Sequence, residues 1–402
     1  MLRAWLEQLI VRGDRTIIHD VKGDMTAGLP VDQFILLAPH DARSAAWDIA
    51  RDIGDRAAGL EFATRSIKAA KGDSMWADGA RALWADAIVS LAKKHGRSWT
   101  LRDLYELLTS PPESFKAALV EGGAASAELI AFDEGGGVQR TSMSLLITLW
   151  VAALTTLKPL VDAWADIPED RRFSLSQWLS ERSSLPKTIV IQKSAAYPEL
   201  SSLVGGLLVE RLAALVLAPG RPRNPPKKVA LVLDELAELG ELRRLPNLLS
   251  VGREVGVMTI AAIQDLGQLV ETYGETTART LEARFGIKMI GRLTAGDTAE
   301  RISKVLIGDR LIQFVEVSQT AVKDNLAREP RREAHPVFPP ERMETDLGVR
   351  SIRGKALIRC LVLGLGDPAL LDLPFTAWPD RRRAHKPAQW MRRASREPTP
   401  SP

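Results

Sequence analysis

Cysteine is almost absent from this chain: Cys360 is the single one among 402 residues. One cysteine excludes an intramolecular disulfide and any metal site built only of cysteines. The five histidines are scattered along the chain without the close spacing of metal ligands. We therefore expect no metal site made from protein residues alone.

No hydrophobic run in the chain reaches the roughly 20 residues that a membrane-spanning helix needs. The most apolar stretch, residues 142–157, is shorter and carries five hydroxyl side chains, which indicates a buried core helix. No signal peptide is visible, because Met1 opens directly on an amphipathic pattern. We expect this chain to be cytoplasmic.

A strong charge of either sign is also lacking, since 54 lysines and arginines face 50 acidic residues for a net charge of +4. This mild basic excess permits nucleic acid as a partner without demonstrating it. A hydrophobic content of 45% and a charged content of 26% are those of an ordinary globular protein. The length is sufficient for two or three domains.

Short apolar runs alternate with helical patterns along much of the chain. We expect a helix at residues 2–11 and strands at residues 16–19, 34–38, 188–192, 229–233, 258–264, 287–291 and 355–365. Such alternation is typical of a parallel sheet covered by helices. Residues 319–342 are polar and charged, and we expect them to form a mobile loop.

A stretch of helical patterns interrupts this order from about Met75. It predicts an inserted all-α domain at residues 73–182, between two parts of one α/β domain at residues 1–72 and 183–380. The tryptophans of this insertion lie on apolar helical patterns and are expected to be core residues: Trp76, Trp84, Trp99 and Trp150. The basic, proline-containing tail at residues 381–402 is expected to be disordered.

Two carboxylates follow the apolar strand at residues 229–233 directly, as Asp234 and Glu235. Ligands of open α/β sheets bind at the carboxyl ends of strands. An aspartate there can hold Mg²⁺ through water on a nucleotide, and the following glutamate can polarise the attacking water, as in the Walker B motif of NTPases. The alternative is a strand that ends at a helix, with Asp234 as N-cap and Glu235 in the first turn. The twelve residues 229–240 do not decide between the two.

Two further side chains follow at ordered distances. Arg253 lies between glycines 252 and 256, where a sharp bend would project its guanidinium from a sheet edge. It can reach a nucleotide on a neighbouring subunit as an arginine finger, and its alternative role is a surface salt bridge. Gln264 ends the next expected strand and can hydrogen-bond a γ-phosphate or the attacking water.

The ordered motifs resemble the nucleotide-binding region of the type IV coupling proteins, the TraD/TraG-like ATPases that bring DNA to conjugative secretion channels. The similarity extends from the first helix to about Trp390. It includes HDVKGD at residues 19–24, LAPHDARSAAWD at residues 37–48, FSLSQWL at residues 173–179 and the segments around Asp234, Arg253 and Gln264. Val21 stands where the family usually has proline, and Ala38 where it has asparagine.

This resemblance implies a RecA-like P-loop NTPase core with an inserted all-α domain, acting as a homo-hexameric ring on single- or double-stranded DNA. It implies ATP and Mg²⁺ as cofactors, with Asp234 on the Mg²⁺ side through water, Glu235 as catalytic base, Arg253 as a finger in trans and Gln264 as γ-phosphate sensor. The implied partners are a relaxase with its relaxosome and the ATPases of a type IV secretion system. Full-length members of the family are anchored in the inner membrane with a cytoplasmic motor domain.

The family's phosphate-binding loop, G-x-x-x-x-G-K-[ST], occurs nowhere in these 402 residues. Without its backbone N–H groups and its lysine, ATP binding is expected to be weakened or lost. The strand that feeds this loop is central in RecA-like sheets, so the core is expected to lack its first strand and to leave unpaired backbone groups on flanking strands. We interpret the chain as truncated at its N-terminus or read from a start codon assigned too late.

Two functions remain open from the sequence. The first is an ATP-driven DNA translocase subunit, supported by Asp234, Glu235, Arg253 and Gln264 in order. The second is a non-catalytic homologue that binds DNA or protein, supported by the missing phosphate loop.

Overall fold

The computed structural model describes residues 2–69, 74–220, 222–225, 228–319 and 326–394. They form two compact units. One unit holds Met1–Trp5 and Gln264–Ala377, and the other holds Leu6–Ile263 and Trp378–Pro402. We call the first the distal unit and the second the sheet unit. The sequence predicted residues 183–380 as the second part of one nucleotide-binding domain, and a boundary between the two units falls within that range at Gln264.

A five-stranded sheet organises the sheet unit, with the strand order β2-β5-β1-β6-β7. Its strands are β1 (Arg15–Asp20), β2 (Ile35–Leu37), β5 (Thr188–Gln192), β6 (Val229–Leu233) and β7 (Val257–Ala261). Every pair in this sheet is parallel. The predicted parallel α/β fold is confirmed.

Burial differs between the strands. Every residue of β1, β5 and β6 is buried, as expected for strands covered on both faces. Four of the five residues of β7 are only half-buried, and β7 lies at the end of the strand order. Among the described residues β7 is therefore an edge strand of this sheet.

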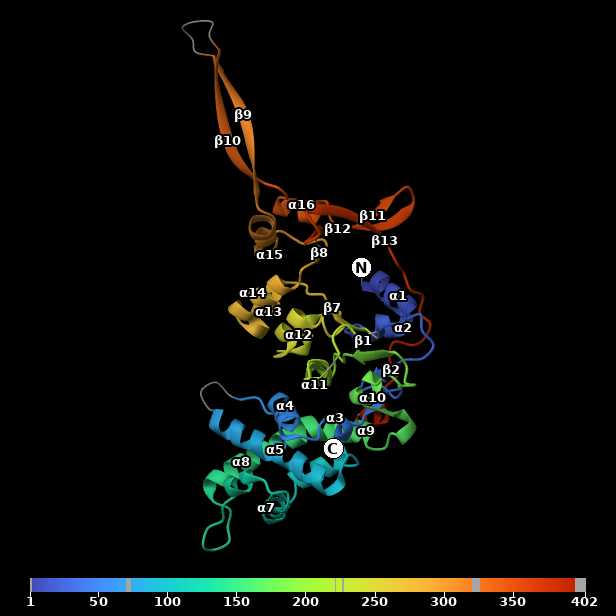
Figure 1. Cartoon of the computed structure of the whole chain (residues 1–402), viewed down its shortest axis with the longest axis vertical. Helices are drawn as coiled ribbons and strands as arrows, with labels where there is room; N and C mark the ends of the chain where they lie inside the picture. The colour runs from blue at the N-terminus through green and yellow to red at the C-terminus, as the bar shows by residue number, and fades with distance from the viewer. Residues whose placement is uncertain (1, 70–73, 221, 226–227, 320–325, 395–402) are drawn as a thin grey trace, which may run out of the picture. The chain divides into compact units, whose positions relative to one another are not determined.

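Helices cover both faces of this sheet (Figure 1). They are α1 (Leu2–Arg12), α2 (Asp24–Gly28), α3 (Ile49–Asp52), α4 (Arg56–Ser66), α10 (Leu175–Leu179), α11 (Pro198–Val216), the 3-10 helix η4 (Leu236–Leu239) and α12 (Leu245–Val251). α11 is apolar on nearly all sides and lies in the core. Its buried Glu210 is neutralised by Arg244, at 3.4 Å.

Between α4 and α10 the chain forms a layer of helices. These are α5 (Ser74–His95), α6 (Leu101–Leu108), α7 (Pro112–Glu121), the 3-10 helix η1 (Ala125–Leu129), α8 (Arg140–Ala152), the π-helix η2 (Ala153–Leu157), α9 (Lys158–Trp164) and the 3-10 turn η3 (Glu169–Arg171). The two short parallel strands β3 (Ala46–Trp47) and β4 (Arg172–Phe173) pair where this layer rejoins the α/β part. Trp84 and Trp99 are buried, as the sequence predicted.

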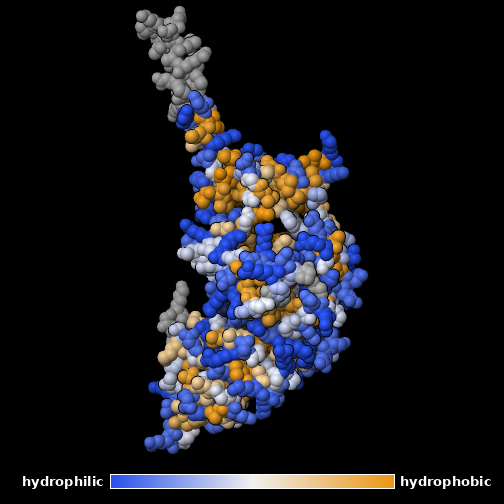
Figure 2. Space-filling view, viewed as in Figure 1, coloured by the Kyte–Doolittle hydropathy of each residue, from blue (hydrophilic) through white to orange (hydrophobic). Residues whose placement is uncertain are grey.

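The run Arg140–Trp164, which comprises α8, η2 and α9, is long and apolar enough to cross a membrane by length and composition alone. Its most apolar window is 44% buried inside the molecule. Leu146, Leu149 and Leu157 lie in the core, whereas Ile147 and Val151 are about half exposed. Hydrophobic residues accordingly reach the surface in the part of Figure 2 where these helices lie.

The distal unit contains an antiparallel sheet and not part of the parallel one. Strands β11 (Gly348–Ile352), β12 (Lys355–Leu363) and β13 (Ala369–Pro374) follow one another, and β8 (Lys288–Ile290) pairs with β12. The sequence predicts strands near β8 and β12 as part of the nucleotide-binding domain. Both strands instead belong to this antiparallel sheet.

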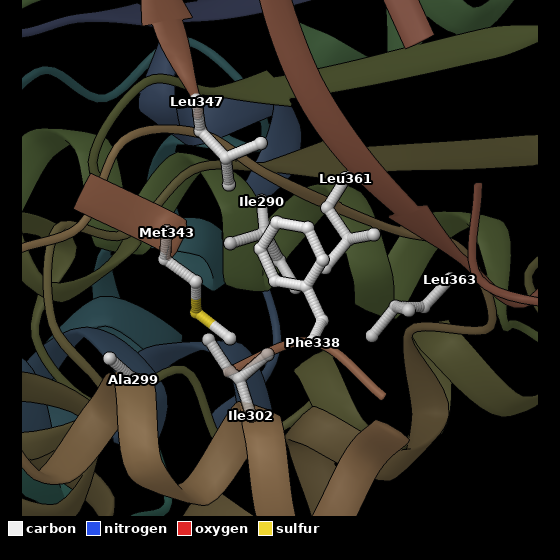
Figure 3. Close-up of a cluster of buried hydrophobic side chains, with 8 residues drawn as sticks. All are labelled: Ile290, Ala299, Ile302, Phe338, Met343, Leu347, Leu361 and Leu363. Atoms are coloured by element: carbon white, nitrogen blue, oxygen red, sulfur yellow. The ribbon is translucent and has the colours of Figure 1, made fainter. Parts of the chain in front are cut away.

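One hydrophobic cluster forms the core of the distal unit (Figure 3). Its side chains come from β8, β12, the helices α15 (Asp297–Arg301), η5 (Ile302–Ile307) and α16 (Pro340–Thr345), and the residues that flank α16: Ile290, Ala299, Ile302, Phe338, Met343, Leu347, Leu361 and Leu363. Helices α13 (Leu266–Tyr273) and α14 (Glu275–Arg284) precede it in the chain.

Two predictions of irregular structure are wrong. The expected loop at residues 319–342 instead contains β10 (Leu326–Pro336), which pairs with β9 (Asp309–Gln319) over eleven residues on each strand. The pairing satisfies the backbone of a charged segment that composition alone would leave in solvent. The expected disordered tail is held against the sheet unit as far as Trp390, which lies in the first turn of the helix α17 (Gln389–Ala394); residues 395–402 lie outside the described residues.

Candidate functional site

The carboxyl ends of β1 and β6 bring several charged residues together. We call this end of the five-stranded sheet the carboxyl edge. β1 ends at Asp20, and Asp234 follows the last residue of β6, its N–H donating to the carbonyl of His19 at 3.3 Å. The Asp20 carboxylate accepts from the N–H of Gly23 at 2.9 Å and from both the N–H and the hydroxyl of Thr26 at 2.6 Å. Asp20 thus holds the turn that leads into α2.

Asp234 lies in an electrostatically unfavourable position. Burial raises the pKa of its carboxyl group, and the nearby carboxylates of Asp20 and Asp24 raise it further, while Lys22 and a hydrogen bond from the backbone of Val21 oppose the change. Burial also raises the pKa of Asp20. Carboxylates crowded in this way are stabilised by a cation.

Glu235 is 5% exposed and occupies the residue before η4. It makes no side-chain cap to that helix, and Asp234 lies one residue further out. Neither carboxylate therefore caps η4 in the way the capped-strand alternative expected, with Asp234 as N-cap.

His19 on β1 supports the backbone at Glu235. Burial lowers the pKa of His19 to about 4, and a hydrogen bond with the backbone of Glu235 opposes that shift only in part. His19 is therefore neutral at pH 7 and fills a buried position between β5 and β6.

Arg253 lies at the opposite edge of the sheet from Asp234. It sits in the turn between α12 and β7, where Gly256 has a positive φ of 76°. Because Val257 pairs with Val229 at the start of β6, about five residues of strand, or roughly 16 Å, separate this turn from Asp234. Arg253 is exposed and makes no ion pair with any described residue, so the salt-bridge alternative is not realised.

Gln264 follows the other end of β7. That strand ends at Ala261, which pairs with Leu233, so the chain leaving β7 emerges at the same edge as Asp234. Gln264 itself is exposed and is the first residue of this stretch in the distal unit. It does not end the strand, as predicted, but lies three residues beyond it.

The residues present fit one half of a magnesium nucleotide site. Asp234, Asp20 and Asp24 offer the carboxylate oxygens that Mg²⁺ prefers. Among the described residues no group of three or more acidic, histidine or cysteine side chains is arranged to hold a metal directly. The motif of the phosphate-binding half occurs nowhere in these 402 residues.

Sequence reasoning missed Asp20, Lys22 and Asp24 as site residues, although they lie within the motif at residues 19–24. Their position in the sequence could have identified them, because they lie at or directly after the end of a buried strand that pairs with β6. Two pockets of the sheet unit lie elsewhere. One of about 1160 Å³ is lined by α4, α8, α11 and the loop after Gly240, and one of about 150 Å³ is lined by Trp47, Trp99 and Trp164 with their neighbours.

The parallel sheet covered by helices, with carboxylates at its carboxyl edge and a layer of inserted helices, is a RecA-like α/β fold. The model of the type IV secretion-system coupling protein DNA-binding domain matches residues 1–343. The chain belongs to this family.

Relatives in sequence agree with this family assignment. The chain is 25% identical over 279 residues to the coupling protein TraD of Escherichia coli K12, an alignment that covers 67% of this chain and 36% of TraD. It is 28% identical over 172 residues to the conjugal transfer protein TraG of Agrobacterium fabrum, covering 41% of this chain and 25% of TraG. These alignments thus span between a quarter and little more than a third of the curated relatives' own length.

Solved structures share the fold. The bacterial conjugative coupling protein TrwBdeltaN70, in an unbound form, superposes with a TM-score of 0.75 at 22% identity, over 97% of this chain and 84% of that one. TrwB in complex with ADP and Mg²⁺ gives a TM-score of 0.72 at 23% identity, over 96% of this chain and 85% of that one.

Proposed function

We propose that this chain is the motor domain of a type IV coupling protein, an ATP-driven DNA translocase that delivers relaxase-bound DNA to a conjugative secretion channel. The observation that carries the proposal is the placement of Asp234 and Glu235 at the end of β6, beside Asp20 and Lys22 at the end of β1. TrwB, whose fold this chain shares, has been solved with ADP and Mg²⁺.

In this proposal ATP is bound with Mg²⁺ at the carboxyl edge. Mg²⁺ would supply charge neutralisation on the phosphates. Asp234 holds the ion through water, Glu235 accepts a proton from the attacking water, and Gln264 hydrogen-bonds the γ-phosphate. The raised pKa of Asp234 supports a cation there, because a positive charge would relieve the repulsion from Asp20 and Asp24.

Arg253 would act on the nucleotide of a neighbouring subunit. Its position at the opposite edge from Asp234 supports this, since a side chain roughly 16 Å of strand away cannot serve the site of its own subunit. The proposal therefore includes a homo-oligomer, a hexameric ring, with DNA in its channel. The relaxase, the secretion ATPases and a position on the cytoplasmic side of the inner membrane belong to the same proposal.

A second function is favoured by a specific observation. Because the phosphate-binding loop occurs nowhere in these 402 residues, the chain can be a non-catalytic homologue that binds DNA or protein.

ATP turnover by the purified 402-residue chain, compared with Asp234→Ala and Glu235→Gln, separates the two functions. The motor predicts DNA-stimulated turnover that falls at least roughly 100-fold in both variants. Turnover equal to that of Asp234→Ala would reject the motor for this chain, and salt-sensitive DNA binding without turnover would support the non-catalytic homologue.

Mixing variants tests the role of Arg253. Asp234→Ala and Arg253→Ala are each inactive if the site needs both groups. A random 1:1 mixture of the two should recover about a quarter of wild-type turnover, because an Arg253→Ala subunit next to an Asp234→Ala subunit forms one complete site. No recovery in mixed rings would reject the action in trans.

A further inference from the structure

The C-terminal segment crosses the carboxyl edge on the side away from β7. We call residues 378–390 the C-terminal strap. Figure 1 shows it as the red chain that runs alongside α2. The whole strap, the strands it contacts and Asp234 belong to the sheet unit.

Trp378 begins the strap. Its ring is 8% exposed, and its indole N–H donates to the Glu7 carboxylate at 2.7 Å. It packs so closely on Gly28 that a Cβ atom on that glycine would lie 2.7 Å from the Trp378 Cβ. This contact joins the strap to α1 and to the end of α2.

Arg382 fastens the strap to the segment between β1 and β2. Its guanidinium donates to the carbonyls of Thr26, Leu29 and Val31, at 3.2, 3.1 and 2.7 Å. It also lies 5.1 Å from the ring centre of Phe34, and burial lowers its pKa. One half-buried cation therefore satisfies three carbonyls of a short connecting segment.

The strap then reaches the strand ends. The Gln192 amide, at the end of β5, donates to the Ala384 carbonyl at 2.8 Å and to the Thr26 hydroxyl at 3.0 Å. Since that hydroxyl donates to Asp20, a continuous chain of hydrogen bonds runs from the strap to the carboxylate beside Asp234.

The strap ends on the segment that follows β2. Asp41 is 2% exposed, and its carboxylate is shared by the Arg43 side chain and by the N–H of Lys386 at 2.8 Å. The Trp390 indole N–H donates to the Pro39 carbonyl at 2.8 Å. The indoles of Trp378 and Trp390 thus fix the two ends of the strap, through the carboxylate of Glu7 at one end and next to that of Asp41 at the other.

We propose that the C-terminal strap is a latch that positions residues 20–29, the segment that carries the charges around Asp234. With the strap in place, Lys22 and Asp24 are held near Asp234 by the turn that Asp20 caps. With the strap released, this turn loses the Arg382 and Gln192 contacts and moves independently of the sheet. Whatever binds the strap from outside would thereby alter the carboxyl edge.

Hydrogen exchange on the full chain without nucleotide tests the latch, and its outcome is independent of ATP turnover. Arg382→Ala should raise exchange of the amides at residues 23–31 by roughly tenfold or more, because their segment loses three tethers. Arg383→Ala is the matched control. It removes an equal charge from an exposed side chain and keeps the backbone carbonyl that Arg43 contacts.

Gly28→Ala provides a second variant that leaves the strap sequence intact. Its added methyl group would press on Trp378, so exchange should rise both at residues 23–31 and within the strap. Equal exchange in Arg382→Ala and Arg383→Ala would overturn the latch. A rise spread evenly over β1, β6 and α11 would also overturn it, since that pattern is global destabilisation.

Discussion

The two halves of the carboxyl edge are built differently. Beyond β1, β2 and β5 the chain is crossed by the C-terminal strap, where carboxylates meet cations and indole N–H groups meet oxygen acceptors. Beyond β6, Glu235 is buried and Asp234 is half-buried, and Asp234 carries a raised pKa among other carboxylates. In the first half, the chain itself supplies partners for the charged and hydrogen-bonding groups. In the second half, a bound cation would lower the repulsion between carboxylates.

Two aspartates show the contrast. Arg43 and the N–H of Lys386 hold the pKa of Asp41 below its usual range despite its burial. Burial and two neighbouring carboxylates move the pKa of Asp234 the other way. Buried acidic groups that keep such an unfavourable position are typical of functional sites.

The largest effect is expected from Trp378→Ala. This substitution removes a nearly buried indole and its hydrogen bond to Glu7, so the free energy of unfolding should fall by about 3–5 kcal/mol. Urea denaturation measures the change. Phe375→Ala, at a ring that is 47% exposed, is the control and should cost less than about 1 kcal/mol. Equal losses would mean that the strap adds little to the fold.

Replacing the two aspartates should change stability in opposite directions. Asp41→Asn leaves Arg43 without its carboxylate and should lower the free energy of unfolding by about 3 kcal/mol at pH 7. Asp234→Asn removes repulsion and should raise it, within the roughly 0.5–2 kcal/mol of stabilising changes at functional sites. Thermal denaturation of both variants without nucleotide checks the signs, and a loss in Asp234→Asn would show that its charge is already compensated.

Acidification should destabilise the fold through two buried histidines, His19 on β1 and His40 after β2. His19 and His40 have pKa values of about 4 in the folded chain against 6.5 when unfolded, mainly because of burial. Their neutral forms are native, so stability is complete above pH 6.5 and falls between pH 6.5 and 4. The loss at pH 5 is about 2 kcal/mol for each histidine.

The variant His40→Gln separates the contribution of His40 to the pH dependence of stability from that of His19. His40 stacks on His385 of the strap with ring centres 5.2 Å apart, and Asp41 and Gln192 also face it. Denaturation at pH 8, 6 and 5 should show a shallower decline in this variant. An unchanged decline would place the pH dependence on other groups.

Arg253→Ala should have the smallest effect on stability. The side chain is exposed and forms no ion pair with the described residues, so the change should stay within about 0.5 kcal/mol. Urea denaturation tests this against Arg43→Ala, which should cost more. A large loss in Arg253→Ala would mean that Arg253 supports the fold, and its proposed role in trans would then need other evidence.

Local signals in the sequence determined the elements of the parallel sheet. The buried strand β6 is a continuous apolar run, β1 and β5 are built around the apolar residues 17–18 and 189–191, and polar residues follow each of these runs. The carboxylates at Asp234 and Glu235 could be located for the same reason, because a parallel strand delivers the next residues to one edge.

Contacts between distant residues decided the rest. β8 and β12 are as apolar as the parallel strands, but an antiparallel partner for each is chosen by the packing around Phe338 and Met343, which no local pattern contains. The strap is basic and proline-containing, and composition predicts disorder for it. The strap becomes ordered because residues in and around α1, α2, β2 and β5 supply hydrogen-bond partners for its carbonyls, its arginine and its indoles. The partners of Arg382 and Trp390 lie more than 340 positions away in the sequence.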